Sequence, residues 1–117
     1  MTQTRFGIIG YAKMGHIRRK AIEARSDAVV VATCDPYAPG DAFPHTHDWE
    51  ELLERDDLDA VVIACTNELI PASVIKALGK GLHVFSEKPP GRTLEDIINI
   101  RAAEAAAPDQ ILKFGFN

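Results

Sequence analysis

The stretch that decides the fold is IIGYAKMGHIRRKAI, residues 8–22. An apolar β-branched run ends at a glycine, and a segment with helical spacing follows, so the stretch predicts a strand, a tight turn and a helix. Gly10, Ala12 and Gly15 stand at the three fixed positions of the G-x-G-x-x-G pattern. In that pattern the glycines allow a sharp turn and a close approach of the backbone to a pyrophosphate, and the helix N-terminus favours the anion. The turn therefore predicts a dinucleotide site, with the Ala12 methyl group as a departure from the pattern.

Apolar runs alternate with helical patterns along the whole chain. Strands are expected at residues 5–9, 28–33, 59–64, 82–87 and 110–116, and helices at residues 13–25, 48–55, 69–81 and 94–107. Each helix must cross over to bring the next strand back in the same direction, so the five strands form a parallel sheet. This order predicts an α/β fold, a Rossmann-type doubly wound parallel sheet in three αβα layers. A flavodoxin-like receiver domain is the alternative, but the acidic cluster usual after its first strand is absent from the sequence.

Spacing and capping signals predict how the helices sit. In the first helix the residues expected to face the sheet recur at steps of three and four: Met14, Ile17, Ala21 and Ala24. Residues 18–20, Arg-Arg-Lys, would then face mostly solvent. Asp48 with Glu51, and Thr93 with Asp96, predict caps at the starts of the second and fourth helices, the first pair as a capping box.

Composition bounds the class of protein. The chain has 117 residues, 46% of them hydrophobic and 26% charged, which is ordinary for one globular domain. The net charge is −4 and no basic block stands out, so we expect no nucleic-acid partner. The apolar runs are too short to span a bilayer, and the N-terminus lacks the apolar segment of a signal peptide. We therefore expect a cytoplasmic protein with no membrane partner.

The cysteines and histidines predict no metal centre. Cys34 and Cys65 each end a β-branched run, as reduced, buried thiols commonly do. A zinc site that combines them with His45 and His47 is a weak alternative, because no paired ligand spacing supports it. The two histidines are expected to be solvated in a polar loop.

An acidic residue lies at the position where dinucleotide-binding domains bind the ribose hydroxyls of the cofactor. Asp35 ends the second strand, 20 residues after Gly15. A carboxylate at this point can accept hydrogen bonds from the adenosine ribose hydroxyls, and it repels a 2′-phosphate. The position therefore favours NAD over NADP. The alternative is that Asp35-Pro36 only starts a turn.

The segment EKPPGRT, residues 87–93, follows the fourth strand. Its two prolines stiffen the loop and hold Lys88 at the carboxyl edge of the sheet, where open α/β folds bind ligands. A lysine there can hydrogen-bond a substrate hydroxyl or join its proton relay, while Glu87 can steady the lysine or take part in the cofactor site. The alternative is a stiff surface turn with a solvated lysine.

Four segments, taken in order, resemble the N-terminal domain of the Gfo/Idh/MocA family, which includes glucose–fructose oxidoreductase and inositol dehydrogenase. They are IIGYAKMG, CDP, VVIACTNELIPASVIKALGKGLHVFSEKP and KFGFN. The resemblance covers nearly the whole chain, and Glu-Lys-Pro is its most specific part. It implies an NAD(P)-dependent oxidoreductase that transfers hydride between a nicotinamide cofactor and a hydroxyl of a sugar, polyol or nucleotide sugar. It also implies a homo-oligomer for the full-length protein.

The resemblance carries specific residues over to this chain. It implies a catalytic Lys88, near the nicotinamide and the substrate hydroxyl. The Thr-Pro-Asn stretch of the family, which lies along the cofactor, reads Cys65-Thr66-Asn67 here and lacks the proline. The full cofactor-binding set that we expect is Gly10, Tyr11, Ala12, Lys13, Met14, Gly15, Asp35, Cys65, Thr66, Asn67, Glu87 and Lys88.

Family members continue after the GFN-like strand into a second α/β domain that holds the substrate and supplies acid–base residues. We therefore expect residues 1–117 to be an isolated dinucleotide-binding domain that binds cofactor without turnover. One alternative is a non-catalytic dinucleotide-sensing or regulatory module, which Ala12 favours. Another is a domain that binds no cofactor and serves in assembly.

Overall fold

The computed structural model describes residues 2–41 and 43–115. Its strands are β1 (Thr4–Ile9), β2 (Ala28–Cys34), β3 (His45–Thr46), β4 (Ala60–Ile63), β5 (His83–Ser86) and β6 (Leu112–Phe114). Its helices are α1 (Lys13–Glu23), α2 (Trp49–Leu53), α3 (Ile70–Gly79) and α4 (Leu94–Ala105), with a 3₁₀ turn η1 (Asn67–Leu69) before α3. The strands form one parallel sheet in the order β3-β2-β1-β4-β5-β6. This order confirms the predicted Rossmann-type fold, because the chain winds from β1 first to one side and then to the other.

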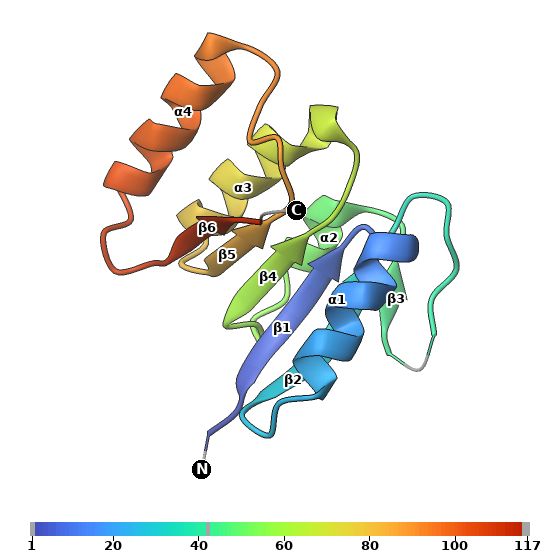
Figure 1. Ribbon diagram of the computed structural model, residues 1–117. Coiled ribbons are helices and arrows are strands. Elements are labelled where there is room, and N and C mark those ends of the chain that lie inside the picture. Colours follow the sequence, from blue (N-terminus) through green and yellow to red (C-terminus); the bar gives the residue numbers. More distant parts are fainter. Residues whose placement is uncertain (1, 42, 116–117) are drawn as a thin grey trace.

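The sheet lies between two layers of helices (Figure 1). Helix α1 packs on one face, over β1 and β2, while α2, α3 and α4 pack on the other. On the α1 side, Ile8, Ile22 and Val62 belong to a small apolar core. On the opposite side, Ile63 and Val74 belong to a larger one. Burial on both faces explains why the strand sequences are continuous apolar runs and not alternating ones.

One strand was missing from the sequence prediction. Residues 35–47 were expected to form a loop throughout, but His45–Thr46 pairs with the end of β2. The backbone N–H of Asp35 donates to the Thr46 carbonyl oxygen at 3.1 Å. Two residues are too few to give an alternating pattern, and the prolines before them favour a loop in any sequence-based interpretation. The consequence is that β3 fixes the backbone at Asp35.

The predicted orientation of α1 is wrong. Met14 is 38% exposed and Ile17 is 44% exposed, while Gly15 and Ile22 are buried. Gly15 decides this orientation, because a Cβ atom on it would lie 2.1 Å from the Gly10 carbonyl oxygen. The close contact turns the Gly15 side of the helix toward the sheet. Arg18 lies on that side and is only partly exposed.

The helix caps are confirmed in part. Thr93 and Asp96 cap α4, and both hydrogen bonds of a capping box are present. Asp48 caps α2 by accepting the Glu50 N–H at 2.9 Å. The expected capping box with Glu51 is wrong, because the Glu51 carboxylate accepts the Thr46 hydroxyl at 2.9 Å instead.

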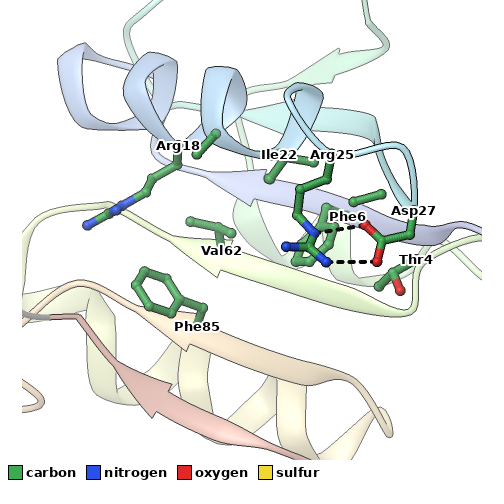
Figure 2. A pocket seen from close by; sticks show the side chains of 10 residues that line it. Thr4, Phe6, Arg18, Ile22, Arg25, Asp27, Val62 and Phe85 are labelled. Atoms are coloured by element: carbon green, nitrogen blue, oxygen red, sulfur yellow. Dashed lines mark hydrogen bonds and ion pairs between the residues drawn. The ribbon is translucent and has the colours of Figure 1, made fainter.

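The α1 face of the sheet is only partly covered. A trench of about 430 Å³ runs between α1 and β5, with Phe6, Ile22, Val62 and Phe85 among its lining residues (Figure 2). No helix within residues 2–41 and 43–115 packs over this part of the sheet. A parallel sheet normally buries both faces, so the trench is apolar surface that the described chain leaves open.

None of the helices that the structure describes is long and apolar enough to cross a membrane. The predicted last strand is confirmed over residues 112–114. Its expected end at residue 116, and Asn117, lie outside the described residues.

Candidate dinucleotide site

The parallel register brings the predicted site residues to one edge of the sheet. The last residues of four neighbouring strands stand level with one another: Cys34 of β2, Ile9 of β1, Ile63 of β4 and Ser86 of β5. The segments that follow these strands therefore start side by side. This edge includes the point where the strand order reverses around β1, which is where open α/β sheets bind their ligands.

The turn after β1 requires both of its glycines. Gly10 has a φ of +96°, and a Cβ atom on it would lie 2.4 Å from the Ala64 carbonyl oxygen. Gly15 meets the Gly10 carbonyl oxygen in the same way. The turn is thus pressed against the segment after β4, and the first turn of α1 begins at this edge. The predicted sharp turn at Gly10 matches the geometry, and Gly15 in addition lets the start of α1 pack closely on that turn.

The start of α1 fits an anion. The N-terminal cap is Ala12, and within the described chain no side chain caps this end and no acidic residue stands in its first turn. The N–H groups of Lys13 and Met14 consequently lack partners inside the helix and point out of its N-terminus. Ala12 has a φ of −92°, outside the left-handed region that favours glycine, so the turn does not require a positive φ there. The alanine matters only for the room left to a ligand.

Asp35 is anchored beside the glycine turn. The residue is 8% exposed, and one oxygen of its carboxylate accepts the N–H of Tyr11 at 2.8 Å. The other oxygen accepts the N–H groups of Tyr37 at 2.8 Å and Ala38 at 2.7 Å. Burial raises the pKa of this carboxyl, but the three backbone donors outweigh burial and hold the pKa below its usual value. Asp35 is therefore an ionised acceptor in a fixed position, with lone-pair capacity left for a ligand hydroxyl.

The neighbours of Asp35 leave a 2′-phosphate without a partner. The five residues that follow it are Pro-Tyr-Ala-Pro-Gly, and none carries a positive charge. A phosphate on the ribose would meet the Asp35 carboxylate without a basic side chain from this segment to balance it. The local sequence and the anchored carboxylate thus both favour an unphosphorylated ribose.

The Tyr11 side chain is locked away from the ligand edge. It is 1% exposed, its ring stacks on His16 at 4.0 Å between centroids, and its hydroxyl accepts from Arg19 at 2.7 Å. Arg19 also pairs with Asp41 at 2.8 Å. Tyr11 was expected in the cofactor set, and it acts on the site through the N–H that it donates to Asp35. Sequence analysis missed Arg19 and Asp41, since no local pattern links residues 22 positions apart.

The histidines hold the segment after β2; His45 is not solvated as expected, whereas His47 is exposed. His45 is half-buried and bonds the Thr33 hydroxyl at 2.7 Å and the Ala38 carbonyl oxygen at 3.0 Å. His47 bonds the Asp35 carbonyl oxygen at 2.8 Å. Both rings thus brace the backbone that presents Asp35. Among the described residues, no group of histidines, cysteines and carboxylates is arranged to hold a metal ion.

Neither cysteine is an activated nucleophile. Both are free thiols, as predicted, with Cys34 buried and Cys65 half-buried. Burial raises the pKa of Cys34 to about 12 and also raises the pKa of Cys65. A thiol with a raised pKa is not ionised near neutral pH, so it reacts slowly.

The segment after β4 and the segment after β5 complete the edge. Thr66 and Asn67 are exposed beside the glycine turn, where a Cβ atom on Gly10 would lie 2.7 Å from the Cys65 nitrogen. Lys88 is exposed after β5, and it makes no hydrogen bond or ion pair with the residues that the structure describes. The Lys88-Pro89 peptide bond is cis. Glu87 forms an ion pair with Arg18 of α1, a partner that sequence analysis had placed toward solvent.

Comparisons with known proteins agree with this geometry. The sequence profile of the Gfo/Idh/MocA group, described as an oxidoreductase family with an NAD-binding Rossmann fold, matches residues 4–115. An inositol 2-dehydrogenase/D-chiro-inositol 3-dehydrogenase of Shouchella clausii is 32% identical over 96% of this chain and 35% of its own length. The chain thus spans about a third of the length of the curated relatives that it matches.

Solved structures share the same fold. The apo scyllo-inositol dehydrogenase of Lactobacillus casei superposes with a TM-score of 0.88 at 26% identity, over 98% of this chain and 37% of that one. The form of the Lactobacillus casei enzyme with bound NAD(H) and scyllo-inositol has a TM-score of 0.90 at 24% identity, over 97% of this chain and 36% of that one. The predicted Rossmann-type architecture is therefore confirmed by comparison as well as by strand order.

Proposed function

Because the chain belongs to the Gfo/Idh/MocA oxidoreductase family and carries its NAD-binding Rossmann domain, we propose that it holds the nicotinamide cofactor of a polyol or sugar dehydrogenase. The reaction is hydride transfer between the cofactor and a hydroxyl-bearing carbon. The observation that carries the proposal is the anchored Asp35 carboxylate beside the glycine turn, at the switch point of the sheet. The inositol dehydrogenases among the relatives support a cyclic polyol as the substrate class.

The residues at the carboxyl edge of the sheet have different roles in this proposal. The N–H groups of Lys13 and Met14 bind the pyrophosphate, and Asp35 accepts the hydroxyls of the adenosine ribose. Thr66 and Asn67 line the path toward the reactive end. When bound, the nicotinamide supplies the carbon that gains or loses hydride. Lys88 donates a hydrogen bond to the substrate oxygen and so favours its charged form.

Titration calorimetry with NAD and NADP tests this function directly on the 117-residue chain. We expect NAD to bind and NADP to bind at least about tenfold more weakly, because the Asp35 carboxylate repels the 2′-phosphate. Asp35→Ser, which removes the charge, should narrow the difference between the two cofactors. If neither cofactor binds at millimolar concentration, the proposal is wrong.

We further propose that the substrate is held by a second domain outside these 117 residues. Two observations support this: the chain spans about a third of its relatives' length, and the trench beside α1 is apolar surface without a cover within the described chain. Positioning of two reactants contributes roughly 7–11 kcal/mol to lowering a barrier, and this chain alone does not provide it. The chain mixed with NAD and an inositol should therefore yield no detectable reduced nicotinamide, whereas steady turnover would contradict a separate substrate domain.

A further inference from the structure

An ion pair joins α1 to the end of β5, directly before Lys88. The Arg18 guanidinium donates from Nε to an Oε of Glu87, and the two side chains are only 25% and 19% exposed. Glu87 is also held by its backbone, since its N–H donates to the Ile63 carbonyl oxygen at 2.8 Å. Both the main chain and the side chain of Glu87 are therefore fixed.

The surroundings of Arg18 hold the guanidinium in this place. It lies over the Phe85 ring at 5.0 Å from the centroid, a cation–π arrangement. Gly115, directly after β6, packs next to the ion pair. A Cβ atom on it would lie 3.5 Å from a Glu87 carboxylate oxygen and 3.6 Å from an Arg18 nitrogen. Figure 2 shows Arg18 extending from α1 across the end of the trench, toward the strand that carries Phe85. Helix α1, β5 and the end of β6 thus converge on one partly buried charge pair.

Because Glu87 pairs with Arg18, its carboxylate is not paired with the neighbouring Lys88. Lys88 is the next residue in the chain and the nearest flexible ammonium by sequence, but among the described residues it makes no ion pair. Glu87 follows the last residue of β5 and its carboxylate meets Arg18 of α1, whereas Lys88 lies in the exposed bend that comes next. With the Arg18 guanidinium in place, the carboxylate needs no second cation.

We propose that Arg18 is a positioning residue for Lys88: by occupying the Glu87 carboxylate, it keeps the Lys88 ammonium unpaired at the ligand edge. The assignment of Lys88 to the substrate oxygen rests on the proposed function, whereas the charge arrangement rests on the structure alone. Without Arg18, the partly buried carboxylate is left without a counter-ion, and it recruits the ammonium beside it. Lys88 would then be turned away from the substrate.

The rate at which an acylating reagent modifies Lys88, resolved by peptide mass spectrometry without cofactor, tests this inference. Arg18→Met keeps an apolar stem over Phe85 but removes the charge, and it should slow the modification of Lys88 about threefold to fivefold, the range of an exposed ion pair. The double variant Arg18→Met/Glu87→Gln should restore the wild-type rate, because the competing carboxylate is gone. Arg18→Lys, which keeps the charge, should stay near the wild-type rate.

Two lysines calibrate the measurement. Lys80 pairs with Glu54 at 3.0 Å, so Glu54→Gln measures the gain when a paired lysine is released. Lys20 is exposed on α1, and its rate should not change in any variant as long as the helix is intact.

Two results would overturn the inference. The first is an unchanged Lys88 rate in Arg18→Met, or a slowed rate that Glu87→Gln does not restore. The second needs no Arg18 variant: Glu87→Gln alone should leave the Lys88 rate unchanged, and an increase would show that the carboxylate pairs with Lys88 already. Calorimetry of the wild-type chain with NAD keeps the two proposals apart, because absence of NAD binding to that chain refutes the proposed function and leaves the labelling result standing.

Discussion

The two ends of the candidate site differ in how firmly they are held. At the β2 end, Asp35 is buried and fixed by three backbone donors, and Tyr11 behind it is fixed by Arg19. At the β5 end, Lys88 is exposed and makes no bond with the described residues. Under the proposed function, the preorganised end would hold the common part of the cofactor, and the open end would face the substrate, which differs between enzymes.

The largest effect is expected at the glycine turn, on which the firm end depends. Gly15→Ala places a methyl group 2.1 Å from the Gly10 carbonyl oxygen and should cost at least about 3 kcal/mol of unfolding free energy. Urea unfolding followed by circular dichroism measures it. The matched control is Gly79→Ala: a Cβ there meets no described atom within 4 Å, so the helix should gain up to about 1 kcal/mol. Equal effects at the two positions would refute the assigned role of the turn.

The second effect is the removal of the anchored charge. Asp35→Asn replaces an acceptor of three N–H groups by an amide that can satisfy only part of them, and it should cost about 2 kcal/mol at pH 7. Because the folded pKa of Asp35 lies below the unfolded one, its contribution is present above the unfolded pKa and is lost as pH falls through the folded pKa. The gap between wild type and variant should therefore shrink between pH 5 and about pH 2. Asp27→Asn, at an exposed pair, should have a much smaller effect.

The third effect tests the room at the pyrophosphate. Ala12→Gly removes the exposed methyl group at the start of α1. The φ of residue 12 is negative, so the turn does not depend on a glycine at this position. NAD affinity should rise modestly, by less than about tenfold, since one methyl group is removed from a contact of many atoms. Calorimetry at a single salt concentration measures it. An unchanged affinity would mean that the alanine is harmless, while a weaker one would contradict the placement of the pyrophosphate.

The smallest effect on stability is expected at the open end. Lys88→Met should change the unfolding free energy, measured by urea unfolding, by less than about 0.5 kcal/mol, because the side chain has no partner among the described residues. A large loss of stability would show that Lys88 is as firmly held as Asp35, and the contrast between the two ends would fail.

Sequence reasoning succeeded where one local signal determines one local structure. The apolar runs, the glycine turn and the Thr93 cap each act within a few residues, and the strands β1, β2, β4, β5 and β6 are confirmed. It failed where a distant contact decides. The orientation of α1 depends on Gly15 meeting a backbone oxygen, and helical spacing alone gave the wrong face.

The charged residues show the same limit. Arg18 and Arg19 were predicted to face solvent as part of a basic run, yet one pairs with Glu87 and the other with Asp41. These partners are 69 and 22 positions away in the sequence, so no local sequence pattern predicts the ion pairs. His45 belongs to the same group, since its bond to Thr33 exists only because β3 pairs with β2.

The three-donor cradle of Asp35 has a consequence for the thermodynamics of ligand association. Groups that are already immobile lose no freedom when a ligand arrives, whereas ordering a long flexible side chain such as Lys88 costs about 0.5–1.5 kcal/mol. The entropic penalty of association should therefore fall on the nicotinamide half of the cofactor. ADP-ribose, which lacks the nicotinamide, should accordingly bind almost as tightly as NAD, so that a truncated nucleotide competes with the complete one.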